Sequence, residues 1–256
     1  GNAAESARSK LAGIGRAFVF ANQAVEILNK ASTKMREYTE AYTAQHVAET
    51  QLAQVMRNTM GASAAEVESI KELASAQQRL GVIGDEVQLA GAKELGTYIQ
   101  QTGTLKSLIP VMNDTIAHQF GLNASQGQAV EIASMMGKVM DGQAGGLSRY
   151  GYTLNETQKK LIETGTEEER LKTLIEVVTP VVDGMNEALR DTPEGKVQSA
   201  AMAMGDLKER VGGLIVELKA KLAPIVETLI AIANGLIDVV QMGWPVWIAV
   251  SAGVLV

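Results

Sequence analysis

The fold is decided by the stretch GASAAE, residues 61–66. A glycine can take the left-handed conformation that ends one helix, a serine can cap the next helix, and a glutamate three residues after that serine can complete a capping box. The same order of residue types recurs as GLNASQ (121–126), GYTLNE (151–156) and, in shortened form, GTEEE (165–169). We therefore expect helix–turn–helix joints with the capping residues Ser63, Asn123, Thr153 and Thr166.

The segments between these joints have the apolar spacing of helices, and none is a convincing strand. The expected helices cover residues 64–80, 85–101, 104–119, 124–141, 154–164, 167–190 and 194–221. The segment closest to a strand is 177–182, but Leu174 and Val178 carry a helical period into it, and Pro180 argues against a central strand. We expect a Pro-kinked helix there and an all-α fold for the chain.

Residues 3–59 form the longest uninterrupted segment, with no proline and with glycine only at positions 13 and 15. Leu11, Ile14 and Phe18 begin a heptad seam, in which apolar residues alternate steps of three and four. This pattern predicts one long helix of roughly 85 Å at 1.5 Å per residue. The seam shifts beyond residue 46, so we expect the helix to pack against other helices, in its own module or in neighbouring copies, rather than in a regular two-stranded coil.

The composition argues against several classes of protein. The formal net charge of −6 leaves little clustered positive charge for sequence-independent binding to nucleic acid. The chain has no cysteine, which excludes disulfides, thiolate zinc sites and cysteine nucleophiles. The sequence contains no phosphate loop, dinucleotide-binding glycine motif, zinc-protease motif or serine-nucleophile motif. We expect no catalytic residue, no cofactor, no metal ligand and no direct sequence-specific binding to nucleic acid.

Single residues that could suggest chemistry have plainer interpretations. His46 and His118 lie on separate expected helices with no accompanying acidic or hydroxyl pattern, so packed or solvated side chains are expected. The glutamates 167–169 complement the positive end of a helix dipole. The methionines within 135–140 favour a loosely specified core over an adaptable Met-rich binding face.

Residues 222–256 differ from the rest of the chain because they contain only two charged residues. One interpretation is a buried helical hairpin, opened by Pro224 and turning around Trp244 and Pro245. The other, which we favour, is a membrane-competent segment in which Trp244 and Trp247 lie near an interface and Asp238 faces water or another helix. The uncharged run 239–256 has 18 residues, close to the about 20 that a membrane-spanning helix needs.

The chain therefore divides into three expected parts. Residues 1–60 form a long coiled-coil-like helix, residues 61–221 a globular helical module, and residues 222–256 the apolar, membrane-competent segment. The last amphipathic stretch of the module begins at Thr192, a candidate cap, and Pro193, which takes the favoured first helical position. The chain starts at Gly1 without an initiator methionine and stops within an apolar run, so we interpret it as a fragment.

Several short passages occur in an order that is found in a known family. After the long Ala/Gln-rich helix that leads to Gly61, the passages are GVIG (81–84), LIPVM (108–112), FGL (120–122), GGLSRYGYTL (145–154), TPEG (192–195), MGDLKERVG (204–212) and LAP (222–224). In this order, and over most of the chain from about residue 45 onward, the sequence resembles the tail tape measure proteins of tailed bacteriophages or prophages. No single passage is diagnostic, because the resemblance lies in their order.

The resemblance implies a non-enzymatic structural protein of the virion, located inside the tail tube. The full-length protein would set tail length and scaffold tube assembly, with the tail tube protein, tail assembly chaperones and other copies of itself as partners. It would be ejected at infection, when apolar segments meet the host inner membrane in the cell envelope and aid DNA entry. The Gly-rich joints indicate a folded module rather than the extended ruler itself. The alternative is an α-helical pore-forming protein whose C-terminal apolar segment inserts into membranes.

Overall fold

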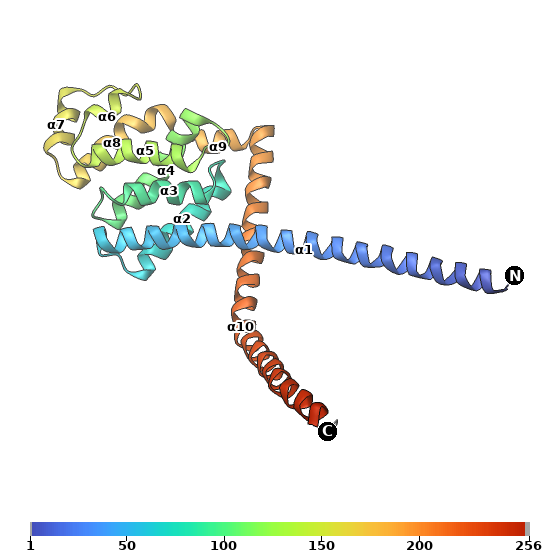
Figure 1. Ribbon diagram of the computed structural model, residues 1–256. Helices are drawn as coiled ribbons and strands as arrows, with labels where there is room; N and C mark the ends of the chain where they lie inside the picture. Colours follow the sequence, from blue (N-terminus) through green and yellow to red (C-terminus); the bar gives the residue numbers. More distant parts are fainter. Residues whose placement is uncertain (1, 254–256) are drawn as a thin grey trace. The chain divides into compact units, whose positions relative to one another are not determined.

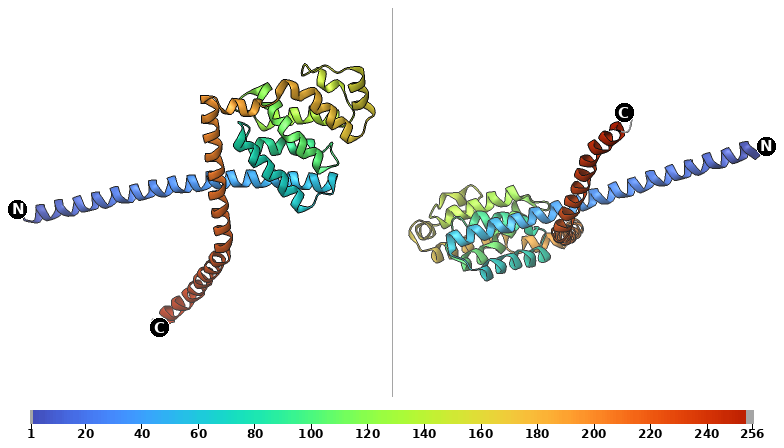
Figure 2. Two further views of the ribbon diagram at one scale, coloured as in Figure 1. Left: turned by 180° about the vertical axis from the view of Figure 1, so that it is seen from behind. Right: turned by 60° about the horizontal axis from the view of Figure 1, so that its bottom comes forward.

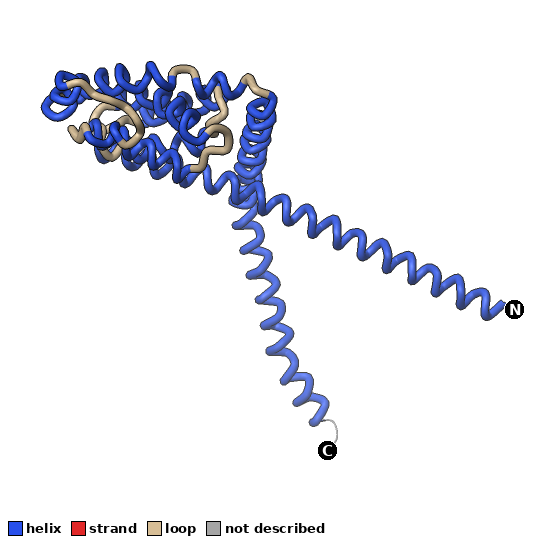
Figure 3. Tube along the Cα trace, turned by 90° about the horizontal axis from the view of Figure 1, so that it is seen from above, coloured by secondary structure: helices blue, strands red, loops and turns tan. Residues whose placement is uncertain are grey.

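The computed structural model describes the backbone of residues 2–253 and the surroundings of the side chains at 26, 27, 29–232 and 234. Within this described backbone every regular element is a helix and no strand is present, which confirms the all-α prediction (Figures 1 and 3). The helices are α1 Asn2–Met60, α2 Ala64–Leu80, α3 Asp85–Leu95, α4 Thr102–Phe120, α5 Gln126–Met140, α6 Gly145–Ser148, α7 Glu156–Thr164, α8 Glu167–Val182, α9 Met185–Arg190 and α10 Pro193–Gly253.

The chain divides into two compact units, and we call residues 41–209 the body. In the body, α3 packs along α5, α4 packs against α8 and α9, and α7 packs against α8 (Figures 1 and 2). Its core extends from the end of α1 to α8 and includes the fully buried side chains Leu52, Met56, Ile70, Leu108, Ile132 and Leu174. The second unit comprises residues 1–40 and 210–256, which hold the remainders of α1 and α10.

The methionines of α5 belong to the core, as the sequence predicted. Met135, Met136 and Met140 are between 0% and 4% exposed. They lie on the same helix as Ile132 and Val139, which are also buried. These thioethers fill space between helices and present no broad Met-rich face to a partner.

Two of the four expected caps are confirmed, and two are wrong. Ser63 and Thr166 each form a capping box, with Glu66 and Glu169 respectively. The second and third joints are two residues longer than predicted, so Ser125, and not Asn123, caps α5. Asn155, and not Thr153, caps α7.

The reason for these two corrections is local backbone geometry. A cap needs extended backbone directly before the first helical residue, whereas Asn123 has a φ of 48° in the left-handed region. Ser125 has a φ of −89°, and its Oγ accepts a hydrogen bond from the backbone N–H of Gln128 at 3.3 Å. The glycines that precede these joints, at positions 121 and 151, do take positive φ angles of 69° and 86°.

Two expected helices are shorter than predicted. The helix expected at 85–101 ends at Leu95, where Gly96 follows as its C-cap. The helix expected at 167–190 contains Pro180, but it ends at Val182 and restarts as α9 after Gly184, whose φ is 70°. The Asp114 carboxylate stabilises this break by accepting hydrogen bonds from the backbone N–H of Gly184 at 3.2 Å and of Asn186 at 2.9 Å.

Two polar side chains form hydrogen bonds with backbone groups at helix ends in the body. Asn186 Oδ1 accepts hydrogen bonds from the backbone N–H of Val82 at 2.8 Å and of Ile83 at 3.3 Å, which holds the turn between α2 and α3. Arg170 donates from Nε to the carbonyl of Ile162 at 2.8 Å and from Nη1 to that of Met140 at 2.9 Å. The Arg170 guanidinium therefore satisfies late carbonyls of α7 and α5, which the helices themselves leave open.

The start of α10 agrees with the sequence. Pro193 is its first residue, and Thr192 Oγ1 accepts a hydrogen bond from the backbone N–H of Gly195 at 3.0 Å. From there α10 continues as one helix through Trp244 and Pro245, so the hairpin turn of the alternative interpretation is absent from the described backbone.

Candidate functional site

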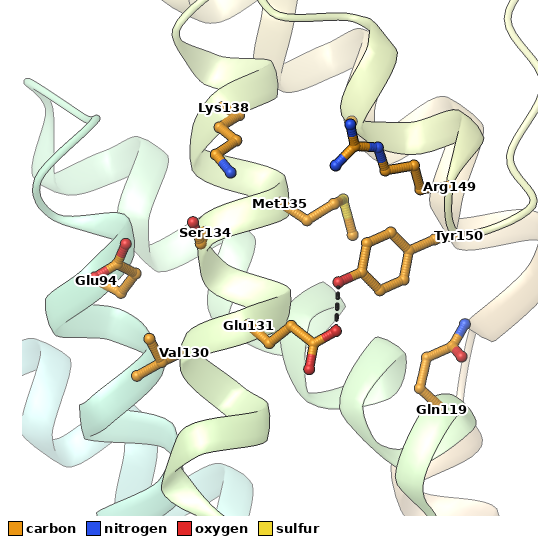
Figure 4. A pocket seen from close by; sticks show the side chains of 10 residues that line it. Glu94, Gln119, Val130, Glu131, Ser134, Met135, Lys138, Arg149 and Tyr150 are labelled. Atoms are coloured by element: carbon orange, nitrogen blue, oxygen red, sulfur yellow. Dashed lines mark hydrogen bonds between the residues drawn. The ribbon is translucent and has the colours of Figure 1, made fainter.

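One candidate site of the body is an open groove of about 770 Å³ beside α5. Figure 4 shows its lining, which comes from α3, α4, α5 and the segment of α6 and the turn after it. The lining residues are Glu94, Gln119, Val130, Glu131, Ser134, Met135, Lys138, Gly146, Arg149 and Tyr150. We call it the α5 groove.

One helical face supplies the wall of the α5 groove. Glu131, Ser134, Met135 and Lys138 follow steps of three and one, so they lie on one side of α5. A Cβ added to Gly146 would lie 3.6 Å from the backbone oxygen of Met135, so α6 passes close to the α5 backbone. This close approach brings Arg149 and Tyr150 to the groove (Figure 4).

The charges of the α5 groove are separated. Lys138 and Arg149 lie towards one end, and the Tyr150–Glu131 pair lies towards the other (Figure 4). Tyr150 donates its phenol hydrogen to Glu131 Oε1 at 2.9 Å. Burial first, and the neighbouring Glu131 carboxylate second, raise the pKa of Tyr150 to about 12. Tyr150 is therefore a neutral hydrogen-bond donor at any physiological pH.

The lining of the α5 groove has charged and hydrogen-bonding side chains that could bind a ligand. It does not place a nucleophile beside a general base. Ser134 is its only hydroxyl besides that of Tyr150, and no histidine lines it. His46 lies on α1, where its ring stacks on Tyr42 with the centroids 5.7 Å apart, and His118 lies in the last turn of α4. In the described part of the chain, no group of three or more histidine, aspartate or glutamate side chains could hold a metal ion.

A second candidate site joins the first turns of α10 to α1, α2 and α3. Gln78 of α2 is its centre: its Oε1 accepts a hydrogen bond from the backbone N–H of Asp85 at 2.6 Å, and its Nε2 donates to Asp206 Oδ1 at 2.8 Å. Gln45 Nε2 of α1 donates to Asp85 Oδ2 at 3.3 Å. We call these four residues, together with Glu209, the α10 contact.

The α10 contact is crowded with carboxylates. Asp85 is 8% exposed, and burial, together with the Glu86 and Asp206 carboxylates, raises its pKa to about 7. Burial and the same acidic neighbourhood also raise the pKa of Glu209 to about 7. Glu49 on α1 forms an ion pair with Lys71 on α2 at 2.8 Å. Asp85 Oδ1 and Gln45 Oε1 are buried without a hydrogen-bond partner.

Sequence reasoning missed both sites. Residues 78 and 206 are separated by 128 positions, and no local pattern relates them. One signal was present: Gln78 continues the buried face of α2 that Val67, Ile70 and Ala74 form. A glutamine at an apolar position indicates a buried hydrogen-bonding role.

Most of the residues predicted for membrane contact fall outside the described side chains. Pro224 lies in α10, while Asp238, Trp244, Pro245 and Trp247 have no described surroundings. Among the residues that are described, no helix is long and apolar enough to cross a membrane.

Comparisons with known proteins give no match to this chain. No protein-family model, no curated protein and no solved structure is similar to it.

Proposed function

We propose that this chain is a segment of a phage or prophage tail tape measure protein, with a non-enzymatic, structural role inside the tail tube. The observation that carries the proposal is the length of the first and last helices, α1 with 59 residues and α10 with 61, each of which has residues in the body and in the second unit. At 1.5 Å per residue each helix is about 90 Å long. A protein that measures distance needs such long uninterrupted helices, and the order of the sequence passages points to the same family.

The exposed surface of α10 supports a role in packing against other chains. Apolar side chains follow one another at steps of three or four residues and are 44% to 66% exposed. They are Leu214, Leu218, Leu222, Ile225, Leu229 and Ile232. We call them the α10 stripe. A helical stripe of this kind is normally covered by another helix, and the proposed partners are other copies of this chain and the subunits of the tail tube.

The proposal predicts that α1 contributes length to the tail. In-frame removal of three heptads, about 21 residues, from residues 3–40 should shorten tails by about 32 Å, because an α-helix rises 1.5 Å per residue. Insertion of three heptads at the same place should lengthen tails by the same amount. Tail lengths are measured by electron microscopy on particles assembled from the genome that encodes the chain. Normal tails of unchanged length in both variants would refute the proposal.

The α10 stripe also favours a second candidate, an α-helical pore-forming protein. This candidate predicts that the full chain releases dye from liposomes, and that a chain ending at Lys221 remains helical and loses this activity. A tape measure segment predicts in addition that the chain is found inside assembled tails. Leakage activity without any association with tails would favour the pore-forming protein.

A further inference from the structure

A small cavity of about 210 Å³ lies between α2, α9 and the first turns of α10, within the body. Two guanidinium groups line it, those of Arg79 at the end of α2 and Arg190 at the end of α9. The hydroxyl of Ser199 on α10 lines it as well, and Asp206 closes one side. This cavity is separate from the α5 groove and shares only Gln78 and Asp206 with the α10 contact.

The cavity contains hydrogen-bonding atoms that the protein does not satisfy. Arg190 Nε and Ser199 Oγ are both buried and have no hydrogen-bond partner. Within the described side chains, neither Arg79 nor Arg190 has an ion pair. An arginine does not lose its proton in a protein, so Arg190 cannot become neutral to avoid the free-energy cost of burying an unpaired donor. A buried charged donor of this kind favours an acceptor, and a group bound in the cavity that Arg190 lines is a candidate for it.

Asp206 is the acceptor that the protein itself could supply to the arginines, but its carboxylate bonds to Gln78 instead. Asp206 Oδ1 accepts a hydrogen bond from Gln78 Nε2 at 2.8 Å, and in the described part of the chain no ion pair joins it to either arginine. The charged side chains that line the cavity are two guanidinium groups and one carboxylate. With a volume of about 210 Å³, the cavity has room for one oxyanion and part of its hydration shell.

We propose that this cavity binds a small oxyanion of the phosphate or sulfate class, held by Arg190 and assisted by Arg79 and Ser199. Guanidinium groups match the oxygens of such an anion with paired hydrogen bonds, and the Ser199 hydroxyl can donate a further one. Because the three side chains come from α9, α2 and α10, a bound anion ties the first turns of α10 to the body. This inference does not depend on the proposed tape measure function.

Inorganic phosphate is the probe, added to the full chain at constant ionic strength with chloride as the reference salt. Binding is measured by NMR through the Nε–H signal of Arg190 and by calorimetry. We expect saturable binding that Arg190→Gln weakens at least tenfold, because it removes the charge and the buried donor. Arg149→Gln, in the α5 groove, is the matched control and should leave the affinity unchanged. Asp206→Asn should tighten binding several-fold by removing a like charge.

Three outcomes overturn the proposal. The first is that the unaltered chain shows no saturable binding of phosphate, and the second is that Arg190→Gln binds phosphate as tightly as the unaltered chain does. The third is binding that occurs only in Asp206→Asn, which would identify Asp206 as the internal partner of the arginines. Circular dichroism shows whether each variant folds. If Arg190→Gln does not fold, Ser199→Ala takes its place, with a several-fold loss of affinity as the expected result.

Discussion

Asp85 makes the stability of the body dependent on pH, and Asp85→Asn tests this dependence. In the folded protein the pKa of Asp85 is about 7, against an ordinary value of 3.8, with burial as the first cause. Each unit of difference in pKa corresponds to about 1.4 kcal/mol, so ionising this carboxyl costs the folded state about 4 kcal/mol at most. The helix dipole acts in the opposite direction, because Asp85 begins α3, but it is worth only about 0.3–1 kcal/mol. The cost of burying the charge therefore dominates.

The sign of the effect follows from the direction of the shift. A carboxyl group whose pKa is raised by folding binds its proton more tightly in the folded state, so its stabilising effect is complete below about pH 4. That stabilisation is lost as the pH rises to about 7, and it changes little above that. The amide introduced by Asp85→Asn carries no charge at any of these pH values. We therefore expect the variant to be more stable than the unaltered chain at pH 8 and to have a flatter pH profile between pH 4 and 7.

The assay is urea unfolding followed by circular dichroism at a series of pH values. Glu168→Gln is the matched control, because Glu168 is an exposed acid in the first turn of α8. Its removal should cost about 0.3–1 kcal/mol through the helix dipole, with no gain at pH 8. If Asp85→Asn instead lowers the free energy of unfolding by the same amount at every pH, the carboxylate is not penalised by burial, and the reasoning is refuted.

Three further predictions concern stability, each measured by urea unfolding at pH 7. Ser125→Ala should cost about 1 kcal/mol through loss of the α5 cap, and no measurable loss would contradict the observed cap position. Arg170→Met should cost about 3 kcal/mol by leaving late carbonyls of α5 and α7 unpaired; a loss below about 1 kcal/mol would show that water replaces the guanidinium. Gly81→Ala should cost about 1–3 kcal/mol, because its Cβ would meet the side chain of Asn186. Gly103→Ala, which has open space inside α4, should stabilise by about 0.5–1 kcal/mol, and equal effects of both glycine changes would contradict the close contact.

Local signals predicted the helices well. The range expected for α2, 64–80, agrees with the structure, because Ser63 and Glu66 form a complete capping box and Gly81 follows the last residue. The predictions failed where two residues of similar type compete, as Asn123 and Ser125 do before α5. The choice between them depends on which one lies directly before the first helical residue, and a single sequence does not specify this.

Neither candidate site could be predicted, because each depends on contacts between distant parts of the chain. The hydrogen bond between Tyr150 and Glu131 joins the turn after α6 to α5, and no local pattern relates these two positions, which are 19 residues apart. Similarly, Asp85 looks like an ordinary acid at the start of a helix, which usually is exposed and stabilised by the dipole. Its surroundings include residues of three other helices, because Gln45 and Gln78 form hydrogen bonds with Asp85 and Asp206 forms one with Gln78.

The attachment of α10 to the body rests mainly on polar groups. The buried apolar core of the described chain ends at Val182, and no apolar side chain of α10 between residues 193 and 232 is buried. The Gln78–Asp206 hydrogen bond therefore helps to keep the first turns of α10 in place. Repulsion among the carboxylates opposes it once Asp85 and Glu209 ionise. The buried apolar core of the body includes no described side chain of α10, so this core can stay packed when the helix loosens. Conditions that change the charge at the base of α10, such as pH above 7 or loss of an anion near Arg190, should consequently loosen this helix before they unfold the body. A helix attached in this way can change its neighbours without loss of the folded module, which is a property that the proposed tape measure role would require.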